Sequence, residues 1–412
     1  MKRALMCLVV LAVSCNELKG PPNGEVQVER AAVTNSFATG SLIIPMDNTY
    51  QNTGMFKAYG LVYKLLSNGI PVHWAVRGDK NANTAVDFTA ATQDITTMTT
   101  QNGMYRGGPF IVDSAQVAAA TPIITAWIIS NPTVHVHKAT TAFSADVTEV
   151  LQAAPKIAVF EDDNEDIAFG VLNAAGIPDS VGNAWVSNSP DVLTAAEISG
   201  PTSGGTSGDG ALLRADGTPA YHFLASMHWA QPVAEVVREV RVWLDASALS
   251  HAYMQCNAVN AFENHANGRF LTNNGVGQET VTTCVLILCS TNDVDPPNPV
   301  VNRFPADVFD QYDGTLTLDT GSLQSMGLAN NSTFKTGVKV LLAGGATGNQ
   351  HLAFVRGNLD GNASNGLISY LTGHDYSTAT PMSTSAPMKS LERIPSFKSA
   401  ILRRSGAGSR DT

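Results

Sequence analysis

Residues 41–76 read SLIIPMDNTYQNTGMFKAYGLVYKLLSNGIPVHWAV, and this stretch carries the clearest indication of the fold. The apolar run at 41–47 predicts a short buried strand closed by a turn. Residues 54–68 place apolar side chains at helical spacing, and Gly69 is suited to end that helix. Residues 70–76 predict a second strand. A strand, a helix and a strand in this order are typical of a βαβ unit, in which the two strands run parallel.

The same alternation continues along the chain. Further strands are predicted at 109–113, 133–139, 156–160, 221–229 and 252–256, and further helices at 121–130, 146–153, 166–175 and 234–246. After residue 290 a proline-rich segment is followed by strand-like segments separated by Gly and Asn turns. The sequence therefore predicts an α/β fold: a mostly parallel, flavodoxin-like sheet flanked by helices, with extra β hairpins toward the C-terminus.

The N-terminus has the features of an export signal. Lys2 and Arg3 precede about ten apolar residues, a run too short to span a bilayer. Residues 11–15, LAVSC, resemble a bacterial lipobox, which implies cleavage before Cys15 and acylation of that cysteine with fatty acids such as palmitate. The residue after Cys15 is Asn16 rather than Asp, and in a Gram-negative cell this resembles a signal for sorting to the outer membrane. The predicted location is the cell envelope, as an outer-membrane lipoprotein attached to the membrane through its lipid. The alternative is an ordinary cleavage site that releases a periplasmic or secreted protein.

The composition of the chain predicts five segments and argues against one class of partner. The predicted segments are a signal peptide with lipobox at 1–15, a flexible tether at 16–39, an α/β body at 40–290, a β-rich continuation or small subdomain at 291–385 and a basic tail at 386–412. The formal net charge is −10, which argues against nucleic acid as a partner. Charged residues make up only 15% of the chain, a neutral-polar balance common in exported proteins.

The cysteines outside the signal raise a question of pairing. With Cys7 in the signal and Cys15 acylated, Cys256, Cys284 and Cys289 remain. Three cysteines in an oxidising compartment predict one disulfide and one thiol, and the sequence leaves the pairing open.

Four segments in this order resemble one superfamily. They are LIIPMD at 42–47 followed by a helix, the helix at 235–245 leading into AYMQC at 252–256, AFEN at 261–264, and LISYLTGHDYS at 367–377. The chain resembles the class I glutamine amidotransferase-like superfamily, especially its ThuA-like branch, over residues 40–400. The resemblance implies the amidotransferase-like form of the predicted α/β fold. The chain departs from the family in two places: Gln255 and Asn257 replace the glycines around the nucleophile, and the His-x-Glu pair is missing. Both departures argue against glutamine hydrolysis.

Cys256 and His374 form the most specific catalytic hypothesis. A thiolate nucleophile needs a base to accept its proton. Both residues lie at the ends of predicted strands and so are expected at the same edge of the sheet, with Glu263 or Asp375 orienting the histidine. The competing interpretation makes Cys256 a buried core thiol or half of a disulfide, and His374 a turn residue.

Two other groups of polar residues suggest weaker sites. His135 and His137 lie on one face of a predicted strand, a spacing that metals use, but with no further ligand at a diagnostic spacing the favoured interpretation is surface histidines. The acidic run at 161–166 could hold Ca²⁺ or supply a carboxylate pair, and it also reads as a solvated loop before a helix. Neither pattern is complete, so no metal and no cofactor are predicted.

The sequence favours a non-catalytic envelope protein that binds a glycan or a protein partner. Two enzymatic alternatives stay open. The first is a hydrolase that uses Cys256 and His374. The second is a carbohydrate-acting enzyme that uses carboxylates such as Glu263 and Asp375.

Overall fold

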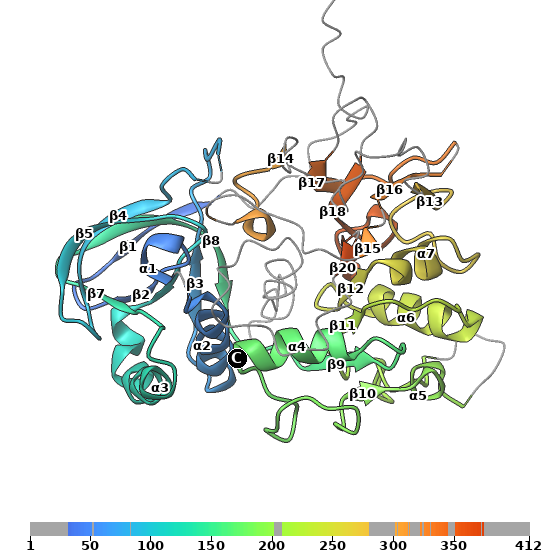
Figure 1. Cartoon of the computed structure of the whole chain (residues 1–412), viewed down its shortest axis with the longest axis horizontal. Coiled ribbons are helices and arrows are strands. Elements are labelled where there is room, and N and C mark those ends of the chain that lie inside the picture. The colour runs from blue at the N-terminus through green and yellow to red at the C-terminus, as the bar shows by residue number, and fades with distance from the viewer. Residues whose placement is uncertain are drawn as a thin grey trace, which may run out of the picture.

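The computed structural model describes residues 32–51, 53–82, 84–201, 208–279, 301–302, 304–311, 313, 322–323, 325–329, 331–344, 351–371 and 373–374. These residues form two large β-sheets with helices packed against them (Figure 1). None of the helices in the described ranges combines the length and the apolar character needed to cross a membrane.

The N-terminal sheet is antiparallel throughout. Its eight strands are β1 (Val33–Phe37), β2 (Leu42–Ile44), β3 (Val72–Ala75), β4 (Phe88–Asp94), β5 (Thr100–Tyr105), β6 (Phe110–Val112), β7 (His137–Ala139) and β8 (Phe143–Leu151). Their spatial order is β1-β8-β3-β6-β2-β7-β4-β5, and every neighbouring pair is antiparallel. The sheet curls into a half-barrel that partly encloses α1 (Asn48–Gln51) (Figure 1).

This sheet shows that the prediction of a mostly parallel sheet flanked by helices was wrong. β2 and β3 do run parallel and are joined through α2 (Met55–Ser67), but β6 lies between them and is antiparallel to both. A strand–helix–strand pattern indicates the direction of two strands, whereas it does not say whether they are neighbours. The region 146–153, predicted as a helix, belongs largely to β8, in which Phe143, Ala145 and Val147 are buried alternately.

Each face of the curled sheet buries its own set of side chains. The enclosed face packs aromatic residues, including Phe37, Phe88 and Phe143, near Tyr50 of α1. The opposite face is covered by α2 and α3 (Val117–Ser130). The core beneath α2 continues into the second half of the chain, where it includes α4 (Asp166–Ala175). One hydrophobic cluster therefore contains residues from both halves of the chain.

The second sheet is half parallel and half antiparallel. Its parallel block contains, in spatial order, β10 (Val192–Leu193), β9 (Ile157–Phe160), β11 (Phe223–Ser226), β12 (His251–Gln255) and β19 (Leu367–Leu371). An antiparallel block extends from β19 and contains β18 (His351–Asn358), β16 (Ser325–Leu328), β13 (Val276–Glu279), β17 (Lys339–Gly344) and β14 (Val301–Asn302). β15 (Ser322–Leu323) and β20 (Gly373–His374) form a separate pair.

Helices cover both faces of the parallel block. α4 packs on one face, while α5 (Ala195–Ser199), α6 (Ala234–Ala246) and α7 (Asn257–Glu263) pack on the other. Short 3₁₀ turns complete the described elements: η1 (Ser114–Gln116), η2 (Val308–Asp310) and η3 (Leu359–Gly361). The bounds predicted for α4 and α6 are confirmed, and Gly176 ends α4 in the left-handed conformation with φ 77°.

Candidate functional site

The candidate site lies where the parallel strands of the second sheet end. Open sheets that contain parallel strands bind ligands at their carboxyl edge. Three chemically active residues follow neighbouring strands here: Asp162 after β9, His228 after β11 and Cys256 after β12. Asp162 and Cys256 are buried, and His228 is half-buried.

Cys256 has a backbone conformation that non-glycine residues rarely adopt. It lies at the sharp turn between β12 and α7, with φ 51° and ψ −124°. Its N–H donates to the carbonyl of Leu371, at the end of the adjacent strand β19, over 2.9 Å. Holding a side-chain-bearing residue in such a conformation costs about 1–3 kcal/mol, and strained residues of this kind gather at active sites. A sharp strand-to-helix turn is also the arrangement that presents a nucleophile above a sheet.

Three residues lie just beyond the last paired positions of three neighbouring strands. Ser226 of β11 lies opposite Met254 of β12, so His228 and Cys256 each lie two residues beyond a paired position. The pairing between β9 and β11 ends at Val159 with Ala225, so Asp162 and His228 each lie three residues beyond it. Asp162, His228 and Cys256 therefore follow the ends of three consecutive strands.

The carboxylate of Asp162 fixes the end of β11. Its Oδ2 accepts hydrogen bonds from Ser226 Oγ (2.8 Å), Met227 N (2.6 Å) and His228 N (3.0 Å). Burial raises the pKa of Asp162, while these donors oppose the rise. Asp162 belongs to the acidic run at 161–166, for which a solvated loop was one interpretation, yet it is only 4% exposed. A buried carboxylate with this many donors holds its neighbours in place.

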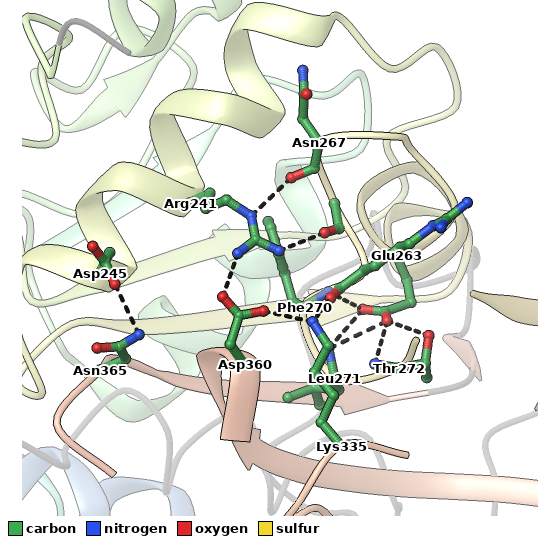
Figure 2. A network of polar contacts seen from close by, with 12 residues as sticks. Arg241, Asp245, Glu263, Asn267, Phe270, Leu271, Thr272, Lys335, Asp360 and Asn365 are labelled. Carbon is green, nitrogen blue, oxygen red and sulfur yellow. Dashed lines mark hydrogen bonds and ion pairs between the residues drawn. The ribbon is translucent and has the colours of Figure 1, made fainter. Parts of the chain in front are cut away.

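Glu263, a predicted catalytic residue, is occupied by the loop that follows α7. Its carboxylate accepts hydrogen bonds from the backbone N–H groups of Phe270, Leu271 and Thr272 and from the Thr272 hydroxyl (Figure 2). It also accepts a hydrogen bond from the Tyr370 hydroxyl. Glu263 is fully buried, and burial raises its pKa. With its oxygens used in this way, Glu263 holds the loop after α7 in place.

A second, more exposed network adjoins Glu263. Arg241 of α6 donates to Asp360 (2.5 Å) and to the carbonyls of Asn267 (3.0 Å) and Gly268 (2.7 Å), and Lys335 pairs with the same Asp360 (Figure 2). These contacts tie α6 to the loop after α7 and to η3. The network supports the fold near the candidate site, and Cys256 is not part of it.

Of the predicted dyad, the structure describes Cys256 and the backbone of His374. The backbone of His374 lies in β20, paired with Ser322, three residues beyond the Leu371 carbonyl that binds Cys256. The side chain of His374 and all of Asp375 lie outside the described residues, as do Cys15, Cys284 and Cys289. The sequence analysis did not single out Asp162 and His228 as partners of Cys256. Asp162 and His228 each follow the end of a strand by two residues.

The histidine pair of the curled sheet makes contacts other than metal coordination. His135 Nδ1 lies 2.7 Å from Asp94 Oδ2, and His137 Nδ1 lies 2.8 Å from the Tyr105 hydroxyl and 3.1 Å from Gln101 Nε2. Within the described ranges no group of three or more His, Cys, Asp or Glu side chains is arranged to hold a metal ion. The pair is therefore explained by packing and hydrogen bonds at the β4–β5–β7 end of the sheet.

A buried carboxylate also stands at the end of β2. Asp47 is fully buried, and its Oδ1 accepts the N–H groups of Thr49 and Tyr50. Its Oδ2 has no hydrogen-bond partner among the described residues. Burial raises the pKa of Asp47 to about 6, opposed by nearby Arg106. The charged form of Asp47 is therefore costly in the folded state.

His137→Gln and Asp47→Asn are expected to change the pH dependence of stability in opposite directions. Burial lowers the pKa of His137 to about 4, so stability is lost as pH falls from about 6.5 to 4, by up to about 3 kcal/mol. The pKa of Asp47 is raised, so the stability that the protonated carboxyl group contributes is lost as pH rises from about 4 to 6. Urea unfolding between pH 4 and 7 should show a shallower rise of stability with pH in His137→Gln and a steeper rise in Asp47→Asn. Slopes equal to that of the wild type would contradict both assignments.

No protein-family model matches the chain, and no curated protein is significantly similar to it. The geometry at the ends of β9, β11 and β12 is therefore the basis for assigning a function.

Proposed function

We propose that this protein is a thiol-dependent hydrolase in which Cys256 is the nucleophile. The observation that carries the proposal is the backbone of Cys256, held at φ 51° and ψ −124° in the turn between β12 and α7. A structural thiol gains nothing from this conformation, because a cysteine in an ordinary strand or helix is equally well buried without strain. A sharp strand-to-helix turn with a strained residue is, in contrast, an arrangement that enzymes use for a nucleophile.

The reaction proposed is hydrolysis of an acyl compound through a thioester. A base accepts the Cys256 proton, and the sulfur attacks the carbonyl carbon to form a C–S bond. The leaving group departs with that proton as the bond to the carbonyl carbon breaks. The base next accepts a proton from water, and the resulting hydroxide attacks the thioester. The acid is released, and the base returns the proton to the thiol.

Export and lipid anchoring stay predictions of the sequence, because residues 1–31 lie outside the described part of the chain. Metabolic labelling with a palmitate analogue tests them. Labelling that is lost in Cys15→Ser supports the anchor, and an unlabelled wild type indicates a plain secretory signal.

The full chain incubated with p-nitrophenyl acetate is expected to carry an acetyl group on the peptide that contains Cys256. Cys256→Gly should reduce p-nitrophenolate release by about 100-fold or more, because the nucleophile is gone. Glycine adopts positive φ without steric cost, so this variant keeps the turn and should be at least as stable as Cys256→Ala. Mass spectrometry of the labelled peptide and urea unfolding of the two variants provide the measurements.

Two results would count against the proposal: no acetyl group on Cys256 in the wild type, and equal release by the wild type and Cys256→Gly. Both would return the protein to the non-catalytic class, as a binder of a glycan or of a protein partner.

A further inference from the structure

We propose that Lys80 and Gln311 become joined by an isopeptide bond that forms within the folded chain, with Asp87 as the acid and base. The bond links Lys80 Nζ to Gln311 Cδ and releases one ammonia. This modification goes beyond the proposed hydrolase activity and does not involve Cys256. The two joined residues are 231 positions apart in the sequence, so the bond closes a large covalent loop.

The first support is that the three reacting groups are already in contact. Lys80 Nζ lies 2.8 Å from Gln311 Oε1 and 3.0 Å from each carboxylate oxygen of Asp87. A carbonyl bond is about 1.2 Å long, so Nζ lies no more than about 4 Å from the carbon that it attacks. Groups held close to the distance of attack, about 3–3.5 Å, react much faster than the same groups free in solution.

The second support is the orientation of the Gln311 carboxamide. Its Nε2 donates to the carbonyls of Pro305 (2.6 Å) and Asp307 (2.7 Å), which keeps Oε1 toward Lys80. The same two carbonyls can accept hydrogen bonds from this nitrogen as it becomes ammonia. Gly108 leaves room for the arrangement, because a Cβ at that position would lie 2.9 Å from Gln311 Cγ. The carboxamide is therefore held in one place from both sides.

The third support is the burial of all three groups. The side chains of Lys80 and Asp87 are 0% and 1% exposed, and Gln311 is fully buried. Burial keeps bulk water away from the carboxamide carbon, which favours attack by the amine over hydrolysis. Burial also lowers the pKa of Lys80 and raises that of Asp87, which favours transfer of a proton from the ammonium to the carboxylate. The transfer yields the neutral amine, which is the nucleophilic form.

The reaction begins when Asp87 accepts a proton from the Lys80 ammonium. The Nζ lone pair forms a bond to Gln311 Cδ, and the carbonyl electrons move to Oε1, which takes the proton from Asp87. The carboxylate next moves a proton from the positively charged Nζ to Nε2. The bond between Cδ and Nε2 breaks, the carbonyl re-forms, and the Oε1 proton returns to Asp87. Asp87 passes this proton to the departing ammonia, so the products are a secondary amide, an ammonium ion and the original carboxylate.

The bond connects the two sheets at a second point besides the backbone. Lys80 lies between β3 and β4, whereas Gln311 directly follows η2. The segment that carries Gln311 is anchored to the second sheet, because Asp307 accepts a hydrogen bond from Arg356 of β18 over 2.6 Å. A covalent loop limits the freedom of the unfolded chain and so favours the folded state. The bond contains no sulfur and is therefore insensitive to reductants.

The experiment is tryptic peptide mapping of the purified full chain after reduction and denaturation. Trypsin does not cut after Lys80 once its amine is part of an amide. The expected product is residues 78–106 joined to residues 304–335, with a mass lower than the sum of the two peptides by one ammonia. Tandem mass spectrometry then locates the bond at Lys80 and Gln311.

Three variants assign the roles. Lys80→Met lacks both the ion pair of the unreacted chain and the bond, and Gln311→Met lacks the carboxamide, so neither yields the joined peptides. Asp87→Asn keeps both partners and should form the bond about 100-fold more slowly or less. Lys156→Met is the matched control, because Lys156 also pairs with a buried aspartate, Asp191, at 4.0 Å. The control should form the bond as the wild type does.

A folded wild type that trypsin cuts after Lys80, with residues 304–335 recovered separately at their sequence mass, would overturn the inference. The wild type decides this question alone, so a variant that fails to fold does not leave it open. Joined peptides that form equally fast in Asp87→Asn would overturn the role given to Asp87. Neither result bears on Cys256, because acetylation of that residue is measured separately.

Discussion

Glu263→Leu is expected to lower the free energy of unfolding by about 3–5 kcal/mol. The substitution keeps a side chain of similar volume but removes the acceptor for three backbone N–H groups and two hydroxyls. Buried donors left without an acceptor cost about 1–3 kcal/mol each, while removal of a buried charge returns part of that cost. Urea unfolding at pH 7, with the slope of the transition checked for two-state behaviour, gives the value.

Asp360→Asn is the matched control, because Asp360 also anchors the loop after α7 but through exposed ion pairs. Its side chain is 42% exposed and pairs with Arg241 and Lys335. Exposed pairs contribute about 1 kcal/mol or less each. A Glu263→Leu variant no less stable than Asp360→Asn would show that the loop finds other acceptors, and Glu263 would again be available for a catalytic role.

Lys80→Met is expected to cost about 3–5 kcal/mol for a different reason. Lys80 Nζ lies 3.0 Å from each Asp87 oxygen and 2.8 Å from Gln311 Oε1, and both charged side chains are almost completely buried. Burial is the largest influence on both groups, since it lowers the pKa of Lys80 and raises that of Asp87. Removing the ammonium leaves a buried carboxylate without its counter-charge, which is the costly outcome for a buried pair.

The double variant Lys80→Met/Asp87→Asn shows whether stability is lost because the ion pair is missing or because an uncompensated charge remains on Asp87. The amide oxygen introduced by Asp87→Asn would still accept a backbone N–H, as the Asp87 carboxylate now does from Arg77 and Gly108. The double variant should therefore recover at least about 1 kcal/mol relative to Lys80→Met in urea unfolding. A double variant as unstable as the single one would mean that the contact with Gln311, and not the charge on Asp87, dominates the loss.

The proposed chemistry and the Glu263 prediction concern neighbouring parts of the second sheet. Glu263 lies at the end of the helix that begins after Cys256, so its loop stabilises the element that carries the thiol. Loss of Glu263 should therefore reduce activity only as far as it unfolds the protein. Loss of the Cys256 thiol in Cys256→Gly should reduce activity in a protein that remains folded.

The sequence by itself determined several local elements and pointed to Cys256 as a candidate nucleophile. The 3.6-residue periodicity and the terminal Gly176 located α4, and the apolar stripe located α6, with the bounds that the structure has. It also placed Cys256 at the end of a strand, because an apolar run stops there. In contrast, β8 was misread as a helix, because its short pattern is compatible with both periods until a partner strand decides.

Only the tertiary structure decided which strands are neighbours and which polar groups share a site. The insertion of β6 between β2 and β3 turned an expected parallel sheet into an antiparallel one, and no local pattern specifies that pairing. Asp162 accepts hydrogen bonds from residues 226–228, which lie 64 to 66 residues further along the chain. The burial of Glu263 among five donors likewise depends on residues 270–272 and Tyr370. Local propensity acts over a few residues, whereas register and burial are set by contacts between distant segments of the chain.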